Sequence, residues 1–213
     1  YSYLPRLITT YIAKGGTGML LFLLFGCLQE PKIEVDTGQC ETSVTDVAKG
    51  LTTEQYEVSE TIEDEFEYIR YGGKWSDFLD NLLQIKKLNH KISFNMLHFL
   101  LNYQSIFGCV DYLKGLGFHN NSFVIGALLS PEYLNIRHLP NNVLNLLRNN
   151  LEERISFNPG YLLEDSYQNM LHYISQPIDK NLSRSFEKLA ELDRRRGLDS
   201  SKIFKDLYKL KEE

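Results

Sequence analysis

The stretch KISFNMLHFLL, from Lys91 to Leu101, is rich in apolar and aromatic residues and is apolar on both faces toward its end. Strands that are buried in a parallel sheet have this pattern, because both of their faces are covered. A second run of the same kind, NSFVIGALL, extends from Asn121 to Leu129. The two runs therefore predict two buried strands.

A helical pattern precedes each of these runs. Apolar residues recur there at spacings of three and four, which places them on one face of a helix. Helix, strand, helix and strand in this order predict βα units with a parallel sheet, and hence an α/β fold. The first stripe consists of Trp75, Phe78, Leu79, Leu82 and Leu83, and the second of Ile106, Val110 and Leu113.

After Pro140 the pattern is helical throughout, which predicts a helical appendage over residues 140–213. Its best-defined helix is DKNLSRSFEKLAELDRRRG, in which Asp179 can cap the start and Gly197 can end the helix. The three arginines before Gly197 are typical of a helix C-terminus, so we interpret them as structural rather than as a phosphate site. The appendage is expected to dock by its apolar faces on the sheet or on a partner.

Composition excludes some classes of function. The 213 residues are 43% hydrophobic and 24% charged, which is typical of a globular chain, and the net charge of -5 argues against a nucleic-acid partner. The three cysteines, Cys27, Cys40 and Cys109, form no CxxC pair. They therefore indicate no disulfide framework and no self-contained metal site, and we expect a reducing, cytoplasmic location.

Residues 1–55 are harder to interpret. The apolar run GMLLFLLFGC, from Gly18 to Cys27, is too short for a transmembrane helix, so we expect no membrane span. It fits either a buried element of an α/β core or the centre of a lipoprotein export signal, with Arg6 and Lys14 before it and Cys27 as the lipid-anchored residue. The lack of an initiating methionine suggests a fragment or a processed product.

The loop FEYIRYGGKW, Phe66 to Trp75, combines an arginine, two adjacent glycines and the chain's single tryptophan. Two interpretations stay open for it. It is either a loop that folds over a ligand or a well-packed start of the helix that follows. A guanidinium suits a carboxylate because its donors form a planar fork, and paired glycines let a backbone approach a ligand closely.

This loop belongs to a longer resemblance. Four stretches resemble the C-terminal half of radical S-adenosylmethionine (radical SAM) proteins of the twitch-domain group. They are VSETIEDEFEYIRYGGKW (residues 58–75), the following FLDNLLQIKKLNHKISFNMLHFLLN, then LGFHNNSF, and the tail LEDSYQNMLHYISQPIDKNLSRSFEKLAELDRRRGLDSSKIF. The resemblance covers the chain from Val58 to its end. It implies that residues 56–139 are a remnant of a partial parallel (β/α) barrel. It also implies that the complete protein binds a [4Fe-4S] cluster and S-adenosylmethionine and generates a 5′-deoxyadenosyl radical.

The resemblance also implies a set of cofactor-binding residues. Ser59 is similar to the polar residue at the end of the family's fourth strand, and Arg70 to the arginine in the loop that follows it. Gly72 and Gly73 would let that loop close over the cofactor. Two further polar candidates on or after the next strand are Asn95 and Asn102.

The chain also departs from the family pattern. It lacks the CxxxCxxC motif whose three thiolates hold the cluster. The five histidines show no metal-ligand spacing, and His98 on an apolar strand is interpreted as a core residue. We therefore expect this chain alone to be inactive, with no catalytic or metal-binding residue of its own. The alternative is a non-catalytic α/β scaffold or interaction protein, lipid-anchored through Cys27 if exported. The substrate class, small molecule or peptide, and the oligomeric state are not indicated.

Overall fold

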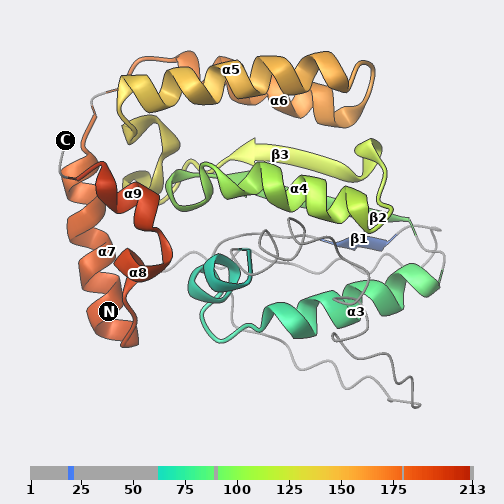
Figure 1. Ribbon diagram of the computed structural model, residues 1–213, viewed down its shortest axis with the longest axis horizontal. Coiled ribbons are helices and arrows are strands. Elements are labelled where there is room, and N and C mark those ends of the chain that lie inside the picture. The colour runs from blue at the N-terminus through green and yellow to red at the C-terminus, as the bar shows by residue number, and fades with distance from the viewer. Residues whose placement is uncertain (1–18, 22–61, 89–90, 179, 212–213) are drawn as a thin grey trace.

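Three parallel strands form the sheet, in the order β1 (Met19–Leu21), β2 (Ile92–His98) and β3 (Phe123–Ala127) (Figure 1). This computed structural model describes residues 19–21, 62–88, 91–178 and 180–211. Within them the fold is mixed α/β and mostly helical, as the two apolar runs and the helical stripes predict. β1 accounts for three residues of the predicted apolar run, whose remainder lies outside the described residues together with Cys27.

Strand β2 has one covered face and one partly open face. Ile92, Phe94, Met96 and His98 are buried, whereas Ser93, Asn95 and Leu97 alternate with them and are half-buried. On the neighbouring strand, Val124 is 43% exposed and pairs in register with Asn95. The run was predicted to be apolar on both faces toward its end. That end is not strand, because the chain turns at Phe99 into the short 3-10 helix η1 (Leu100–Asn102).

Helices α3 (Trp75–Lys87) and α4 (Ser105–Gly115) alternate with the strands as predicted. α3 buries Trp75, Leu79 and Leu82. α4 lies over the covered face of the sheet in Figure 1, where the Phe107 ring contacts the His98 ring at a centroid distance of 5.4 Å. A further helical segment spans residues 62–69 and precedes the turn that contains Gly72 and Gly73.

A helical hairpin closes the sheet beyond β3. It consists of α5 (Asn141–Phe157) and α6 (Leu162–Ser175), which lie side by side in Figure 1. The Ile125 amide of β3 donates a hydrogen bond of 3.0 Å to the hydroxyl of Ser166 on α6. Because this amide points away from β2, α6 occupies the place where a further strand would pair.

The C-terminal helices are α7 (Leu182–Arg196), α8 (Ser200–Ile203) and α9 (Lys205–Lys209). The Asn181 side chain caps α7 by accepting a hydrogen bond from the Arg184 amide, and Gly197 ends the helix in the left-handed conformation with φ 67°. The predicted end at Gly197 is thus confirmed. The predicted cap, Asp179, lies outside the described residues.

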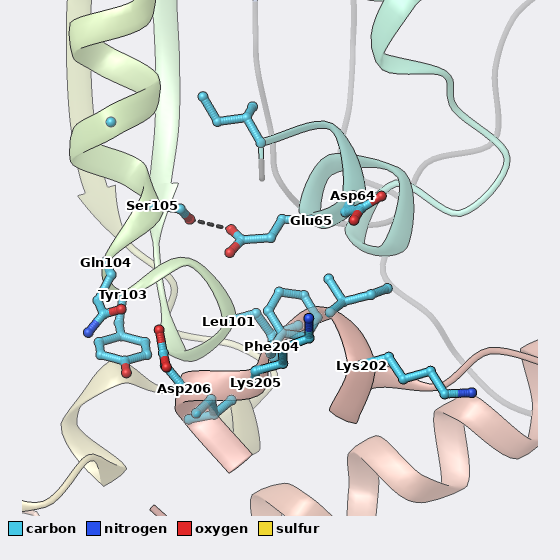
Figure 2. Close-up of a pocket in the computed structure, with 14 residues that line it drawn as sticks. Asp64, Glu65, Leu101, Tyr103, Gln104, Ser105, Lys202, Phe204, Lys205 and Asp206 are labelled. Carbon is cyan, nitrogen blue, oxygen red and sulfur yellow. Dashed lines mark hydrogen bonds between the residues drawn. The ribbon is translucent and has the colours of Figure 1, made fainter. Parts of the chain in front are cut away.

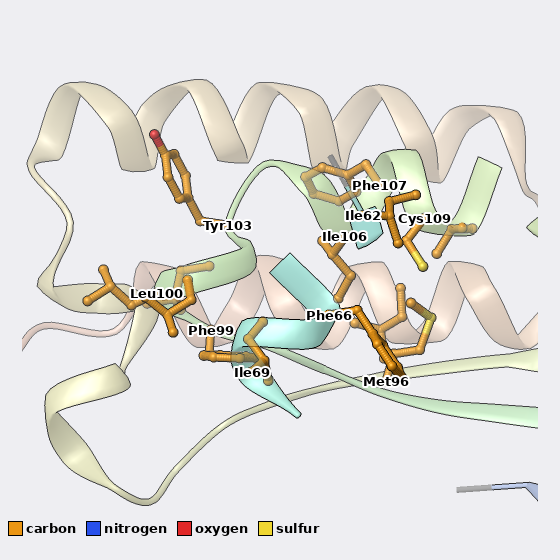
Figure 3. Packing of buried hydrophobic residues seen from close by; sticks show 14 of the residues in the cluster. Ile62, Phe66, Ile69, Met96, Phe99, Leu100, Tyr103, Ile106, Phe107 and Cys109 are labelled. Atoms are coloured by element: carbon orange, nitrogen blue, oxygen red, sulfur yellow. The ribbon is translucent and has the colours of Figure 1, made fainter. Parts of the chain in front are cut away.

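One hydrophobic core joins the elements from residue 62 onward. It extends from Ile62 in the first described helix to Leu207 in α9, so the predicted segments 56–139 and 140–213 share a core. Figure 3 shows its centre, where Phe66, Met96 and Ile106 meet from three different elements. Three short 3-10 helices, η2 (Asn120–Ser122), η3 (Glu132–Leu134) and η4 (Ile136–His138), connect the larger ones. Among the described helices, none has the length and apolar character needed to cross a membrane.

Candidate functional site

The predicted loop from Phe66 to Trp75 is loop only over residues 70–74, between the helix of residues 62–69 and α3, and an aromatic cluster holds this segment. The Phe66 ring lies 5.2 Å from the Trp75 ring and 5.5 Å from the Phe78 ring, centroid to centroid, and Trp75 stacks on Phe78 at 5.1 Å. Contacts at these distances are favourable beyond the apolar area that they bury. The cluster joins the helix of residues 62–69 to the start of α3, as the interpretation of a well-packed helix start predicts.

The two glycines are required by the turn itself. Gly72 has φ 90°, a conformation that side chains other than glycine rarely adopt. At Gly73 an added Cβ would lie 3.1 Å from the Arg70 carbonyl oxygen, whose hydrogen bond from the Gly73 amide closes the turn at 2.7 Å. The backbone therefore explains both glycines, and a role in cofactor binding stays a prediction.

Arg70 is half-buried at this turn. Its guanidinium carbon lies 5.5 Å from the centroid of the Phe66 ring, within cation–π range. The adjoining ion pair between Lys74 and Glu67, at 2.7 Å, and a weak bond from the Trp75 amide to Glu67 fix the end of the loop. The Phe66 ring contacts the Arg70 guanidinium, and the role of Arg70 toward a carboxylate stays a prediction.

Asn95 and Asn102 differ in what surrounds them. Asn95 lies on the partly open face of β2, and its side chain makes no hydrogen bond to the described residues. Asn102 is buried, and both the oxygen and the nitrogen of its side-chain amide form hydrogen bonds with the backbone. Its Oδ1 accepts from the Phe99 amide at 2.8 Å, and its Nδ2 donates to the Leu97 carbonyl at 2.8 Å. Asn102 thus shapes the turn after β2, whereas a cofactor-binding role of Asn95 stays a prediction.

Of the remaining predicted residues, Ser59 lies outside the described part of the chain. A [4Fe-4S] cluster can be tested against the thiol that is described. Cys109 is buried in the core, where burial raises the pKa of its thiol to about 12. Metal ligation needs an accessible thiolate, and among the described residues no group of three or more His, Cys, Asp or Glu side chains could hold a metal. The described residues therefore do not fit the cluster.

His98 is a core histidine, as interpreted from the sequence. Its side chain is 1% exposed, and Nε2 lies 3.1 Å from the Tyr103 carbonyl oxygen. Burial lowers the pKa of His98 to about 4, against a smaller opposite effect of this hydrogen bond. The imidazole is therefore neutral at physiological pH and holds the turn between β2 and α4.

The arginine run at the end of α7 has a structural partner. Arg196 donates from Nη1 to the Tyr68 carbonyl oxygen at 3.1 Å and lies over the Tyr71 ring. The Tyr68 hydroxyl in turn donates to Asp193 Oδ1 at 2.8 Å, while Asp193 Oδ2 accepts from the Ser200 amide at 2.9 Å. These bonds attach the C-terminal helices to the segment from Phe66 to Trp75, more than a hundred residues away in sequence. Arg196 thus has structural contacts, as the interpretation of the run expects.

A pocket of about 700 Å³ lies at the turn that follows β2. Three segments line it: the start of the helix of residues 62–69, the stretch 101–108 with the first turn of α4, and residues 202–207 of α8 and α9. Figure 2 shows Glu65 extending toward Ser105 inside it. Ligands of α/β proteins bind at the carboxyl ends of strands, so the position of this pocket is favourable for binding.

Glu65 is the titratable residue of greatest interest in this pocket. It is half-buried, and its Oε2 accepts a hydrogen bond from the Ser105 hydroxyl. Burial raises the pKa of Glu65 to about 7, the Ser105 bond opposes this, and the charge of Asp64 adds to it. Carboxyl groups with a raised pKa inside a pocket are candidates for acid–base or binding roles.

Glu65 is not among the residues that the sequence patterns predict for a site. It is one of several acids in ETIEDEFEYIR, and its partner Ser105 is 40 positions away. Glu65 stands three residues after Ile62 and four residues before Ile69, so helical spacing places it on the side of these two apolar residues.

A scan against models of protein families, a search of curated proteins and a search of solved structures each found no match to this chain.

Proposed function

We propose that this chain is the C-terminal half of a radical SAM-type protein. In this proposal it supplies the last strands of a partial (β/α) barrel and the helices that end the barrel. The complete protein would bind a [4Fe-4S] cluster and S-adenosylmethionine. The observation that carries the proposal is the asymmetry of the sheet, which has one covered face, one partly open face and one closed edge.

Each of these features is expected of the terminal part of a barrel. Barrel helices pack on the outer face of the strands, as α4 does where Phe107 contacts His98, and the inner face is left for ligands and inward side chains. Asn95 and Val124 lie on the face that would be the inside of the proposed barrel. The bond from the Ile125 amide to Ser166 ends the sheet at β3, so further strands could join only beyond β1.

The proposal assigns a limited part to the described residues. Asn95, on the open face, and Arg70, in the loop before α3, would contact S-adenosylmethionine. The thiolates of the cluster would come from outside the described residues, because Cys109 is unsuited to that role. When bound, the cluster would supply the electron that cleaves the cofactor. The chain by itself is therefore expected to be inactive.

Binding of S-adenosylmethionine tests the proposal. The complete reading frame that contains this chain is expressed and purified without oxygen, and binding is measured by equilibrium dialysis. We expect Arg70→Ala and Asn95→Ala each to weaken binding at least about tenfold, the effect of losing one good polar contact. Arg194→Ala, which removes an exposed arginine of α7, is the matched control. Absence of binding by the unmodified protein would reject the proposal.

A second candidate function is a non-catalytic α/β scaffold or interaction protein. It is favoured by the structural use of Asn102, Gly72 and Gly73, three of the six residues that the resemblance implies for the cofactor. Under this alternative the complete protein binds neither iron nor S-adenosylmethionine. The two candidates also differ in location: the first is cytoplasmic, and the second allows export and lipid attachment at Cys27. Cell fractionation with labelled fatty acid distinguishes them.

A further inference from the structure

The carboxylate of Glu65 forms no ion pair with the described residues, although Lys202 and Lys205 also line its pocket. Its hydrogen-bond partner is the neutral hydroxyl of Ser105. Within the part of the chain that the structure describes, no lysine, arginine or histidine forms an ion pair with it. Removing a carboxylate from water without a cation is unfavourable. The group therefore either keeps its proton or takes a positive charge from a bound molecule.

The other charged side chains that line the pocket are exposed, and two of them form ion pairs with residues other than Glu65. Lys202 pairs with Asp199 at 3.2 Å and its side chain is 81% exposed, and Asp206 pairs with Lys209 at 2.6 Å. The pocket wall combines polar and apolar side chains. Its apolar residues are Ile62, Leu101, Ile203, Phe204 and Leu207.

We propose that this pocket binds a small organic cation, a primary amine with an apolar part, whose ammonium group pairs with Glu65. The ammonium would lie beside the Ser105 hydroxyl, and the apolar part would lie against Leu101 and Phe204 (Figure 2). A volume of about 700 Å³ is sufficient for a molecule of metabolite size. The inference goes beyond the proposed function and uses none of the residues on which that function depends.

Binding is expected to depend on pH through Glu65. The charged and titratable groups that face it are Asp64 on its own helix, Tyr103 and Cys109 from the β2–α4 side, and Asp206 with Lys205 from α9. A carboxyl with a pKa of about 7 is about one-tenth ionised at pH 6 and about nine-tenths ionised at pH 8. The amine keeps its charge over this range. Affinity for the amine should therefore rise about tenfold between these pH values.

Two matched probes separate the charge from the apolar contact. They are 2-phenylethylamine and its neutral counterpart 2-phenylethanol, titrated into the full 213-residue chain and followed by the NMR shifts of the Ser105 and Gly108 amides. We expect the amine to shift both amides and to bind at least about tenfold more tightly than the alcohol at about pH 8, because the alcohol cannot form the ion pair.

The variant Glu65→Gln keeps an oxygen for the Ser105 hydroxyl and removes the charge. We expect it to bind amine and alcohol equally weakly. Glu152→Gln, which neutralises an exposed residue of α5, should bind as the unmodified chain does. The proposal is overturned if the amine fails to bind the unmodified chain at up to about 10 mM. Equal affinities for amine and alcohol, affinity independent of pH, or unchanged binding by Glu65→Gln would overturn it as well.

Discussion

The hydroxyl of Ser166 on α6 accepts a hydrogen bond from the backbone amide of Ile125 on β3, at 3.0 Å, and itself donates to the Leu162 carbonyl oxygen at 2.9 Å. One side chain thereby satisfies an edge amide of the sheet from a helix. This bond determines where the sheet ends, because an edge amide that already donates to a side chain is not free to pair with a further strand. In the proposed barrel, this closed edge makes β3 the last strand.

Replacing Ser166 by alanine should therefore weaken the closed edge. The Ile125 amide loses its partner in a buried position, so we expect the free energy of unfolding to fall by about 1–3 kcal/mol. The Ile125 amide should also exchange with solvent much faster, which hydrogen exchange measured by NMR detects. Ser175→Ala is the matched control, since Ser175 makes the same type of bond, to Leu171, on the exposed side of the same helix. Equal losses in both variants would contradict the role of Ser166.

The bond from Tyr68 to Asp193 attaches the C-terminal helices to the first described helix. Tyr68 is 2% exposed, and its ring packs edge-on against Phe204 at 5.1 Å. Tyr68→Phe keeps that packing and removes a hydrogen bond to a charged group, so we expect a loss of about 1–3 kcal/mol in urea denaturation. Tyr71→Phe removes a longer, exposed bond of 3.5 Å to the Arg196 carbonyl oxygen. Its effect should stay within about 0.5 kcal/mol.

Alanine substitutions of Asn102 and Asn95 should distinguish a structural residue from a binding residue. Asn102→Ala leaves the Phe99 amide and the Leu97 carbonyl without partners, so we expect the free energy of unfolding to fall by about 2–4 kcal/mol. Asn95→Ala removes no bond to the described residues and should change stability by less than about 0.5 kcal/mol. Chemical denaturation of both variants tests this difference. A large loss in Asn95→Ala together with a small one in Asn102→Ala would reverse our assignment.

Glu65 should make stability depend on pH. Its folded-state pKa, about 7, lies above the ordinary value of 4.5, so between these values the folded chain binds more protons than the unfolded chain. Glu65 therefore lowers stability progressively as pH rises from about 4.5 through about 7. Glu65→Gln should match the unmodified chain near pH 4.5 and exceed its stability by about 1–3 kcal/mol near pH 8, measured as urea midpoints. A constant difference across this range would exclude the raised pKa.

Periodicity in the sequence was sufficient to predict the alternating part of the fold. The stripe from Trp75 to Leu83 and the run at Ile92–His98 became α3 and β2, because burial of one face is a local pattern that a single chain displays. The partly open face of β2 was not predicted. Ser93 and Asn95 are polar residues of moderate size, and whether a strand face is covered depends on elements distant in sequence.

The candidate pocket could not be predicted from the sequence, for a similar reason. Glu65, Ser105 and Phe204 come from three separate segments, and their approach depends on the attachment of α7 and α8 through Asp193. The raised pKa of Glu65 results from burial, which no local pattern of acids encodes. The arginine run, by contrast, was interpreted correctly as structural for Arg196, because a basic last turn is a property of the helix itself.

The most direct test of the central proposal is the iron content of the complete protein. The longest reading frame that contains this chain is expressed and purified without oxygen, its iron is quantified, and its absorption spectrum is recorded. We predict about four irons per chain, the content of one [4Fe-4S] cluster, held by an upstream CxxxCxxC motif. A complete protein without that motif and without iron would contradict the proposal and favour the non-catalytic α/β interaction protein.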